Sequence, residues 1–181
     1  MNTALIPAVQ ERSTALTSMA DAAVTAGPLE VLTCQLGGVS YGIELRCVQE
    51  IRSYEAPTRI ANAPDFIKGF VNLRGVIVPV IDLRLSFGLP VPAYDAFTIT
   101  VVLNLADRIV GVVVDSVSDV IALLPSQIKP APDFNDTVDA RYIAGIGTPD
   151  ESSSDARMLV LLDIEKLMSS AAMGLVQPVL Q

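Results

Sequence analysis

The sequence predicts a mostly β protein built from two similar small barrels of about five strands each, packed together, with one short helix near its end. Two observations predict this fold: short segments rich in Val and Ile, and an internal repeat. β-Branched residues fit the pleated, packed surface of a sheet. With 181 residues, 51% of them hydrophobic, the chain can bury about two thirds of its unfolded surface. Disorder throughout is therefore excluded.

The first strands are expected to follow a flexible tail. Residues 1–28 are mostly Ala, Thr, Ser and Val, with few charges and no firm apolar period, which is typical of a disordered segment. From Leu29 onward, apolar and polar residues alternate on both sides of Gly37-Gly38. Alternation around a two-residue glycine turn indicates a β-hairpin.

The remaining elements are short. Val- and Ile-rich runs predict strands over 70–73, 76–83, 97–105, 108–114 and 157–162. Helical turns are expected after Pro64 and near Ser126. One true helix is expected from Ile164 to about Met173, since Asp163 suits its N-cap and Gly174 its exit. Residues 173–181 are expected to form a second tail.

The internal repeat consists of four blocks that recur in the same order. The aligned pairs of segments are 42–51 with 111–120, 63–66 with 131–134, 66–71 with 142–147, and 77–83 with 158–164. Collinear order favours a duplication, with a first copy at roughly 39–95 and a second at roughly 97–165. The alternative is one ordinary sandwich with similar strands. The sequence leaves open which barrel each terminal strand joins.

Charge and composition exclude several classes of function. The chain has 20 acidic and 12 basic residues and a net charge of -8, which argues against nucleic acid because phosphate binding needs clustered Lys and Arg. Its apolar runs, such as 76–81, fall far short of the ~18 residues of a spanning helix, so direct membrane insertion is not expected. Two cysteines without a disulfide framework favour a cytoplasmic protein.

Catalysis is not expected either. The chain has no histidine, so the usual general base and the commonest neutral metal ligand are missing. The repeated Asp82 and Asp163 could suggest an aspartic dyad, but neither is followed two residues later by the glycine that such a site uses. Both suit helix caps or turns better. No phosphate loop, dinucleotide fingerprint or metal-ligand spacing is present, so no cofactor or metal is predicted.

Arg74 is the most informative charged residue. It stands in an Asn-Leu-Arg-Gly turn between two strongly apolar segments within 69–83, so its side chain must face solvent or a partner. Arginine at the edge of an apolar patch is a favoured interface anchor. The composition is equally consistent with an alternative, in which Arg74 is only a turn residue that keeps the surface soluble.

Several segments between residues 29 and 172 match one family pattern, namely 41–44, 48–52, 58–62, 66–69, 72–79, 117–120, 128–134 and 163–167. Together they resemble the CheW family of bacterial chemotaxis coupling proteins. The resemblance implies two five-stranded, SH3-like barrels side by side and a non-enzymatic adaptor. Such an adaptor couples methyl-accepting chemoreceptors to the regulatory domain of the histidine kinase CheA, in arrays that can include other CheW copies.

The resemblance also implies two contact sites. The groove for the receptor's cytoplasmic tip includes Val48, Glu50, Ile51, Gly69, Arg74, Ile99, Thr100, Val117 and Val120. The second kinase contact includes Lys129 and Phe134, although the family often has Arg at the position of Lys129. The protein is then expected in the cytoplasm, recruited to membrane-associated arrays.

Other functions stay open at this stage. The same scaffold could serve another chemosensory pathway, for example surface motility. A small barrel that binds a hydrophobic ligand would need an internal cavity, which short apolar strands tend to fill with side chains. A carboxylate-only enzyme would need a buried acid pair, for which Asp82 and Asp163 are the candidates.

Overall fold

The computed structural model describes residues 27–90, 93–106, 108–132, 138–150 and 157–170. Its strands are β1 (Leu29–Leu36), β2 (Val39–Glu44), β3 (Val48–Ser53), β4 (Ile67–Leu73), β5 (Val76–Asp82), β6 (Ile99–Leu105), β7 (Arg108–Val114), β8 (Ser116–Leu123), β9 (Ile128–Lys129), β10 (Ile143–Gly147) and β11 (Leu159–Leu162). Its helices are α2 (Leu83–Ser86), α3 (Ile164–Ser169) and the 3-10 turns η1 (Leu45–Cys47), η2 (Pro125–Gln127) and η3 (Val138–Tyr142).

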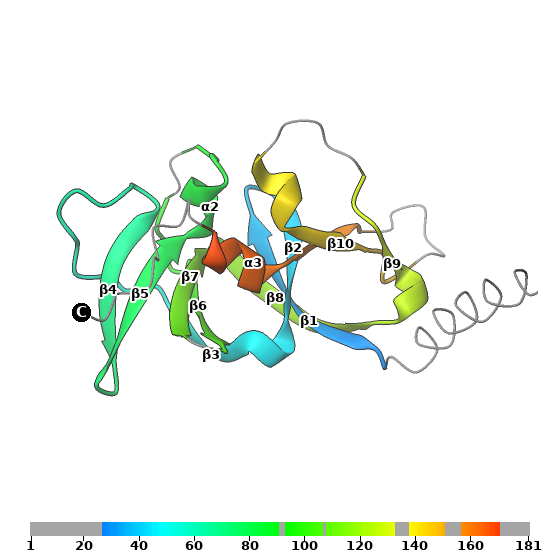
Figure 1. The fold of residues 1–181 in the computed structure, drawn as a ribbon, viewed down its shortest axis with the longest axis horizontal. Helices are drawn as coiled ribbons and strands as arrows, with labels where there is room; N and C mark the ends of the chain where they lie inside the picture. The colour runs from blue at the N-terminus through cyan, green and yellow to red at the C-terminus, as the bar shows by residue number, and fades with distance from the viewer. Residues whose placement is uncertain (1–26, 91–92, 107, 133–137, 151–156, 171–181) are drawn as a thin grey trace, which may run out of the picture.

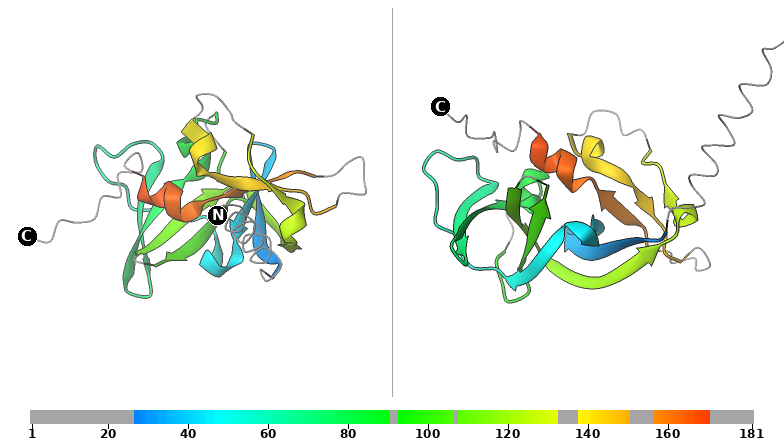
Figure 2. Two further views of the ribbon diagram at one scale, coloured as in Figure 1. Left: turned by 45° about the vertical axis from the view of Figure 1, so that its right-hand side comes forward. Right: turned by 60° about the horizontal axis from the view of Figure 1, so that its bottom comes forward.

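The strands form two sheets that lie next to each other (Figure 1). The first sheet has the order β8-β1-β2-β11-β10-β9 and the second β3-β6-β7-β5-β4. Figure 2 shows that both sheets are curled. The mostly β fold of two packed units is therefore confirmed.

The two sheets share one topology, which confirms the internal repeat. Strands β8, β1, β2, β11 and β10 of the first sheet stand in the same order as β3, β6, β7, β5 and β4 of the second. The register irregularities coincide as well. The shift between Ile67 and Gly69 in β4 recurs between Ile143 and Gly145 in β10, as the alignment of 66–71 with 142–147 requires.

The sheets do not follow the two sequence copies 39–95 and 97–165. β2 of the first copy pairs in parallel with β11 of the second, and β5 of the first pairs in parallel with β7 of the second. Each sheet thus combines strands from both copies. The sequence could not show this exchange, because an interior Val-rich strand is equally suited to either sheet.

The first sheet has a sixth strand where the sequence predicts five. Lys129 and Ile128 of β9 pair with Ile146 and Gly147 of β10. At the equivalent place in the second sheet only an isolated bridge forms, between Thr58 and Phe70. Pro57 precedes Thr58, and proline has no N–H to extend the ladder.

The prediction of elements is right for the long apolar strands and less complete elsewhere. It misses β3, β8 and β10. Of these, β3 and β8 are outermost strands that carry polar side chains on one face, so they lack the continuous apolar run that identifies an interior strand. It also misses α2, whose N-cap Asp82 ends β5 and accepts a 3.0 Å hydrogen bond from the Arg84 N–H. The Asp163 cap of α3 is confirmed, and the 3-10 turn near Ser126 is present.

Several expectations fall partly or wholly outside the described residues. The segment 1–28 is described only from residue 27, and 171–181 lies outside the described residues. The prediction that the last helix runs to about Met173 is wrong, because α3 ends at Ser169 and the backbone of its C-cap Ser170 is extended. Among the described residues no helix is long and apolar enough to span a bilayer.

The main core lies between the sheets. It joins residues of the first sheet, such as Leu32 and Ile43, to residues of the second, such as Val101 and Val112. Leu167 and Met168 of α3 also belong to it. Two smaller clusters, around Leu123 and around Leu73, consist of residues of one sheet each together with their neighbouring loops. The two sheets therefore form one continuous packed body.

Candidate partner-binding site

An apolar strip runs along the junction of the two sheets, on the outermost strands β3 and β8 and at the start of β6. Its members are Val48, Ile51, Ile99, Val117 and Val120, all among the expected receptor contacts. Val48, Ile99 and Val117 are half-buried and pack against the shared core. Ile51 and Val120 remain 45% and 50% exposed. This apolar strip is thus an edge of the core that is partly exposed to solvent.

The apolar strip has internal symmetry. The repeat aligns Val48 with Val117 and Ile51 with Val120. The structure places them equivalently, because Val48 pairs with Leu103 of β6 while Val117 pairs with Cys34 of β1, the strand that corresponds to β6. Ile51 and Val120 likewise pair with Val101 and Leu32. Two matching apolar pairs therefore border the junction.

The polar members of the expected receptor site lie on the opposite face of β3. Glu50 is half-buried, and one of its carboxylate oxygens accepts a 2.9 Å hydrogen bond from Nη2 of Arg74. Its other oxygen lies 3.6 Å from Nη1 of Arg52. Because β3 and β4 are opposite ends of the second sheet, the Glu50–Arg74 pair spans the gap between these ends. Thr100 is buried on the same side.

Arg74 occupies a strained turn. Leu73 pairs with Val76, so Arg74 and Gly75 form a two-residue hairpin loop with φ of 51° and 88°. Both angles are positive, as a type I′ turn requires, and Asn or Gly is the usual residue at the first position. The Arg74 side chain is 79% exposed. An arginine held in this conformation at an exposed tip suggests selection for the side chain rather than for the turn.

Gly69 has a structural role, because its lack of a side chain allows two backbone segments to approach each other. It is buried at φ 132°, and a Cβ there would lie 1.9 Å from the Thr58 carbonyl oxygen. The close approach lets Phe70 and Thr58 exchange two 2.9 Å backbone hydrogen bonds. Gly69 thus attaches the 54–66 loop to β4.

Of the expected kinase contacts, the structure describes Lys129, exposed in β9, whereas Phe134 lies outside the described residues.

The structure does resolve an ambiguity of the repeat, in which Phe66 aligns with both Phe134 and Tyr142. The Phe66 carbonyl accepts from the N–H of Asp82 at 2.7 Å, and the Tyr142 carbonyl accepts from the N–H of Asp163 at 2.8 Å. Tyr142 is the structural counterpart of Phe66, so the core position is filled without Phe134.

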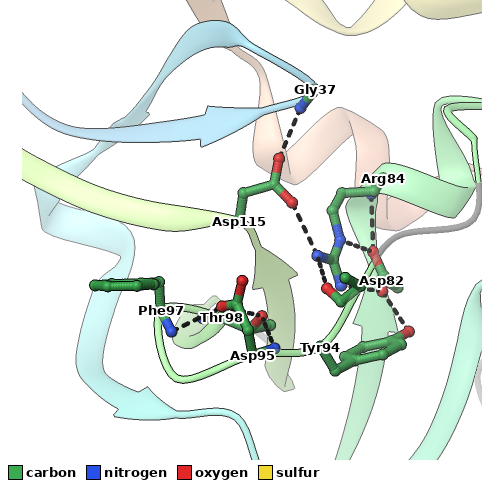
Figure 3. Close-up of polar contacts among 9 residues, drawn as sticks. Gly37, Asp82, Arg84, Tyr94, Asp95, Phe97, Thr98 and Asp115 are labelled. Carbon is green, nitrogen blue, oxygen red and sulfur yellow. Dashed lines mark hydrogen bonds and ion pairs between the residues drawn. The ribbon is translucent and has the colours of Figure 1, made fainter.

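A buried polar network joins the sheets near the apolar strip (Figure 3). The Arg84 guanidinium donates through Nε and Nη2 to both oxygens of Asp82, at 3.0 and 2.9 Å. Its Nη1 donates to Asp115 at 2.8 Å and to the Ala93 carbonyl at 3.1 Å. The Tyr94 hydroxyl donates to Asp82 at 2.7 Å. Both carboxylates of this network therefore contact the same guanidinium, and Asp82 is also hydrogen-bonded to Tyr94.

Asp115 makes this network a link between the sheets. It stands between β7 and β8, and its second oxygen accepts a 2.8 Å hydrogen bond from the N–H of Gly37, in the β1–β2 turn of the first sheet. Arg84 follows β5 of the second sheet. Asp115 also precedes the apolar strip residue Val117 by two positions. The network therefore fixes where β8 begins.

The sequence interpretation of Asp82 as a cap is right but incomplete, and it misses Arg84 and Asp115. One signal could have found them. In the repeat, Arg84 aligns with Glu165 and Asp115 with Arg46, so both charges are reversed together. The Glu165 charge does act on Arg46, raising its pKa after the larger effects of the hydrogen bond and charge of Glu44. Paired charge reversal at aligned positions thus indicates that the two positions lie near each other.

The network shifts the pKa values of its members. Burial by itself lowers the pKa of Arg84, but hydrogen bonds to Asp82 and Asp115 outweigh it, and the net pKa is raised. Burial, and then the hydrogen bond to Asp82, raise the pKa of Tyr94. Both residues keep their neutral-pH protonation states over a wide range.

Comparison with known proteins agrees with this geometry. The family model described as "CheW-like domain" matches residues 30–172. A chemotaxis protein CheW of Klebsiella aerogenes is 53% identical over 150 residues, covering 83% of this chain and 87% of that protein. The CheW of Treponema pallidum is 32% identical over 152 residues, covering 82% and 86%. The crystal structure of the scaffolding protein TtCheW from Thermoanaerobacter tengcongensis matches with a TM-score of 0.66 and 29% identity, covering 75% of this chain and 88% of that chain.

The fold and these matches define a scaffold protein, that is, a protein that acts by binding other proteins. The chain belongs to the CheW-like family of chemotaxis scaffold proteins.

Proposed function

We propose that this protein couples methyl-accepting chemoreceptors to the histidine kinase CheA, without performing chemistry of its own. The observation that carries the proposal is the apolar strip, in which Val48 and Ile51 of β3 match Val117 and Val120 of β8. An open apolar strip of this kind suits a helix that lays its apolar face into a groove. The occupant is then the helical cytoplasmic tip of a receptor.

Glu50 on the other face of β3 and its partner Arg74 in the β4–β5 turn extend the receptor site in this proposal. Arginine can donate several directed hydrogen bonds, so a receptor carboxylate or carbonyl can replace the exposed Glu50 contact at little cost. The apolar strip then supplies affinity, and Arg74 supplies orientation.

The proposed kinase contact is a separate surface that includes Lys129 and Phe134. Tyr142 already fills the core position equivalent to Phe66, so Phe134 is not needed there. With receptor and kinase on different surfaces, the adaptor can bias the kinase through differential contacts, with a coupling energy of typically ~1–3 kcal/mol. In this proposal the protein acts in the cytoplasm, recruited to receptor arrays, where other CheW copies can join the rings.

The test is co-sedimentation with receptor-containing membranes, first without CheA. Ile51→Asp and Val120→Asp should each abolish sedimentation of an otherwise folded protein, since a carboxylate on the apolar strip cannot be desolvated against a receptor helix. Val39→Asp is the matched control, because Val39 is also 45% exposed on a strand but lies outside the strip. If Ile51→Asp and Val120→Asp sedimented with the membranes as well as Val39→Asp does, the proposed receptor site would be rejected.

The kinase surface has its own test. Lys129→Asp combined with Phe134→Ser should leave sedimentation with receptor membranes unchanged and should impair array order. Normal hexagonal arrays in cryo-tomograms of cells carrying this variant would contradict the second surface.

A small-molecule binding function has less support. A hollow of about 210 Å³ opens between the ends of the second sheet, lined by Arg52, Thr58, Asn72, Leu73, Val78 and neighbouring residues. Ligand pockets usually measure ~300–1,000 Å³ and are mostly apolar. A chemosensory pathway other than chemotaxis would use the same contacts, and the names of the relatives favour chemotaxis.

A further inference from the structure

Phe97 is an exposed aromatic residue at one end of the apolar strip. It is 74% exposed, more than any other large apolar residue among the described ones. It precedes the strip residue Ile99 by two positions, so the two Cα atoms lie at most about 7 Å apart. Ser53 of β3 pairs with Ile99, and the Tyr54 N–H donates to the Thr98 carbonyl at 3.0 Å. Phe97 therefore lies where β3 and the apolar strip end.

The turn that carries Phe97 is fixed by its own hydrogen bonds (Figure 3). One carboxylate oxygen of Asp95 accepts from the N–H groups of Phe97 at 2.8 Å and Thr98 at 3.1 Å. The Asp95 N–H in turn donates to the Thr98 hydroxyl at 3.0 Å, and Thr98 is only 2% exposed. In Figure 3 the Phe97 ring projects away from Asp95, Thr98 and the buried network. The anchored turn thus holds the ring outside the core.

A ring held in this way is suited to binding. A turn that is ordered before a partner arrives loses little conformational entropy on binding. Phenylalanine is also enriched where proteins meet. A single exposed apolar residue is common on protein surfaces, but Phe97 is not isolated, because it extends the row formed by Ile51 and Ile99. Its exposure therefore belongs to the apolar strip.

Phe97 has no counterpart in the first sheet. The strand pairing makes Val101 of β6 equivalent to Leu32 of β1. Counted back along both strands, the residue equivalent to Phe97 is Pro28. A charged residue, Glu30, follows Pro28 at the position where a strip residue follows Phe97. A partner therefore meets similar apolar pairs from both sheets but an aromatic contact from the second sheet alone.

The added length corresponds to one turn of a helix. Residues two apart on a strand are separated by about 6.6 Å, and an α-helix rises about 5.4 Å per turn. A helix laid along the apolar strip therefore brings a residue three or four positions further on level with Phe97.

We propose that Phe97 is a further contact for the receptor helix, an inference that rests on the proposed receptor function. Its complement is a large apolar side chain, one helical turn beyond the residues that meet Ile51 and Ile99. The kinase is a poorer occupant, because Lys129 of the proposed kinase surface lies in the first sheet. A second copy is also poorer, because it would bring together two chains of net charge -8.

Thiol labelling of the full chain tests the contact. The native Cys34 and Cys47 are buried and should react slowly with a maleimide. Phe97→Cys and Ile51→Cys each add one exposed thiol. With about nine-tenths of the protein bound to receptor-containing membranes, without CheA, labelling of both should fall about tenfold. Met158→Cys is the control, because Met158 is 67% exposed beside β11 of the first sheet, and its labelling should not change.

The two thiols separate this inference from the proposed function. Protection of Ile51→Cys without protection of Phe97→Cys would overturn the Phe97 contact and leave the receptor site in place. Protection of neither would reject the receptor site, and this inference with it. Protection of Phe97→Cys by CheA alone, or by a higher protein concentration without membranes, would assign Phe97 to the kinase or to a second copy and would overturn the inference.

A pair of substitutions measures what the ring contributes. Phe97→Leu keeps a large apolar side chain and should sediment with receptor membranes almost as the original chain does. Phe97→Asp should weaken that binding by about tenfold or more, because a carboxylate cannot be desolvated against an apolar partner. Urea unfolding should give similar midpoints for both variants, since the side chain lies outside the core. Equal binding of the two folded variants would contradict the contact.

Discussion

Arg84 and Asp115 form a 2.8 Å ion pair that links the end of the second sheet to the start of β8. The Arg84 side chain is almost fully buried, and it reaches Asp115 and Asp82 at once. Its repeat counterparts Arg46 and Glu165 have reversed charges and lie at the surface. The ionic link between these two repeat positions is therefore seen in one arrangement only, because the ion pair of Arg46 is with Glu44.

Replacement of Arg84 should therefore be costly. Arg84→Met leaves Asp82 buried without its cation, and breaking a buried pair in this way typically costs about 3–5 kcal/mol of the free energy of unfolding. Urea unfolding measures the loss. Arg46→Met is the matched control, because the Arg46 side chain is 73% exposed, and it should leave the free energy of unfolding nearly unchanged. Similar losses in both variants would contradict the structural role of the buried network.

Arg74 should separate stability from partner binding. Arg74→Asn places a residue that tolerates positive φ before Gly75, which is the preferred sequence of a type I′ turn, and should raise the free energy of unfolding by about 0.5–1 kcal/mol. The same change removes the guanidinium and should weaken receptor-dependent control of the kinase. Arg74→Ala should leave the fold intact and weaken that control equally. Full kinase activation by either variant, with unchanged receptor affinity, would exclude Arg74 from the receptor site.

Gly69 should behave as a structural position. Gly69→Ala forces a Cβ against the Thr58 carbonyl at an unfavourable φ, so the free energy of unfolding should fall by more than about 3 kcal/mol. Gly38→Ala is the control for φ alone: Gly38 has a φ of 82° and open space around it, and its loss should be about 1–2 kcal/mol. Thermal unfolding compares the two. If Gly69→Ala retained full stability yet lost receptor binding, Gly69 would be a direct contact after all.

Stability should fall at alkaline pH. Burial, with a smaller effect of the Asp115 charge, raises the pKa of Cys34 from 9.0 to about 12. The neutral thiol is favoured in the folded state, so this stabilisation is complete below pH 9 and is lost as the pH rises towards 12. The slope should reach up to about 1.4 kcal/mol per pH unit for this group.

Denaturant unfolding at several pH values measures that slope. Cys34→Ala should make it shallower between pH 9 and 12, the range between the two pKa values. Leu36→Ala, a truncation in the same strand and core, should lower stability without changing the slope. Identical slopes for the original chain and Cys34→Ala would show that the thiol does not contribute.

Much of the architecture could be predicted from the sequence, because it depends on local patterns. Alternation about Gly37-Gly38 predicts the first hairpin, and Val-rich runs predict the interior strands. The collinear blocks predict the duplication, down to the equivalence of Val48 with Val117. The Asp163 cap needed only its position before an apolar helical run. In each case the physical cause lies within a few residues of chain.

The tertiary structure alone decided how the copies combine. The parallel pairs β2–β11 and β5–β7 exchange strands between the copies, because buried strands of similar composition can pair in either arrangement. It also showed that Gly69 is required by a carbonyl 11 residues away in sequence, at Thr58, and that Arg84 meets Asp115 across 31 residues. Such contacts depend on how distant segments fit together, which no local pattern specifies. The sequence by itself thus determined the mostly β, duplicated character of this scaffold, and only packing decided which of its similar strands and charges became buried.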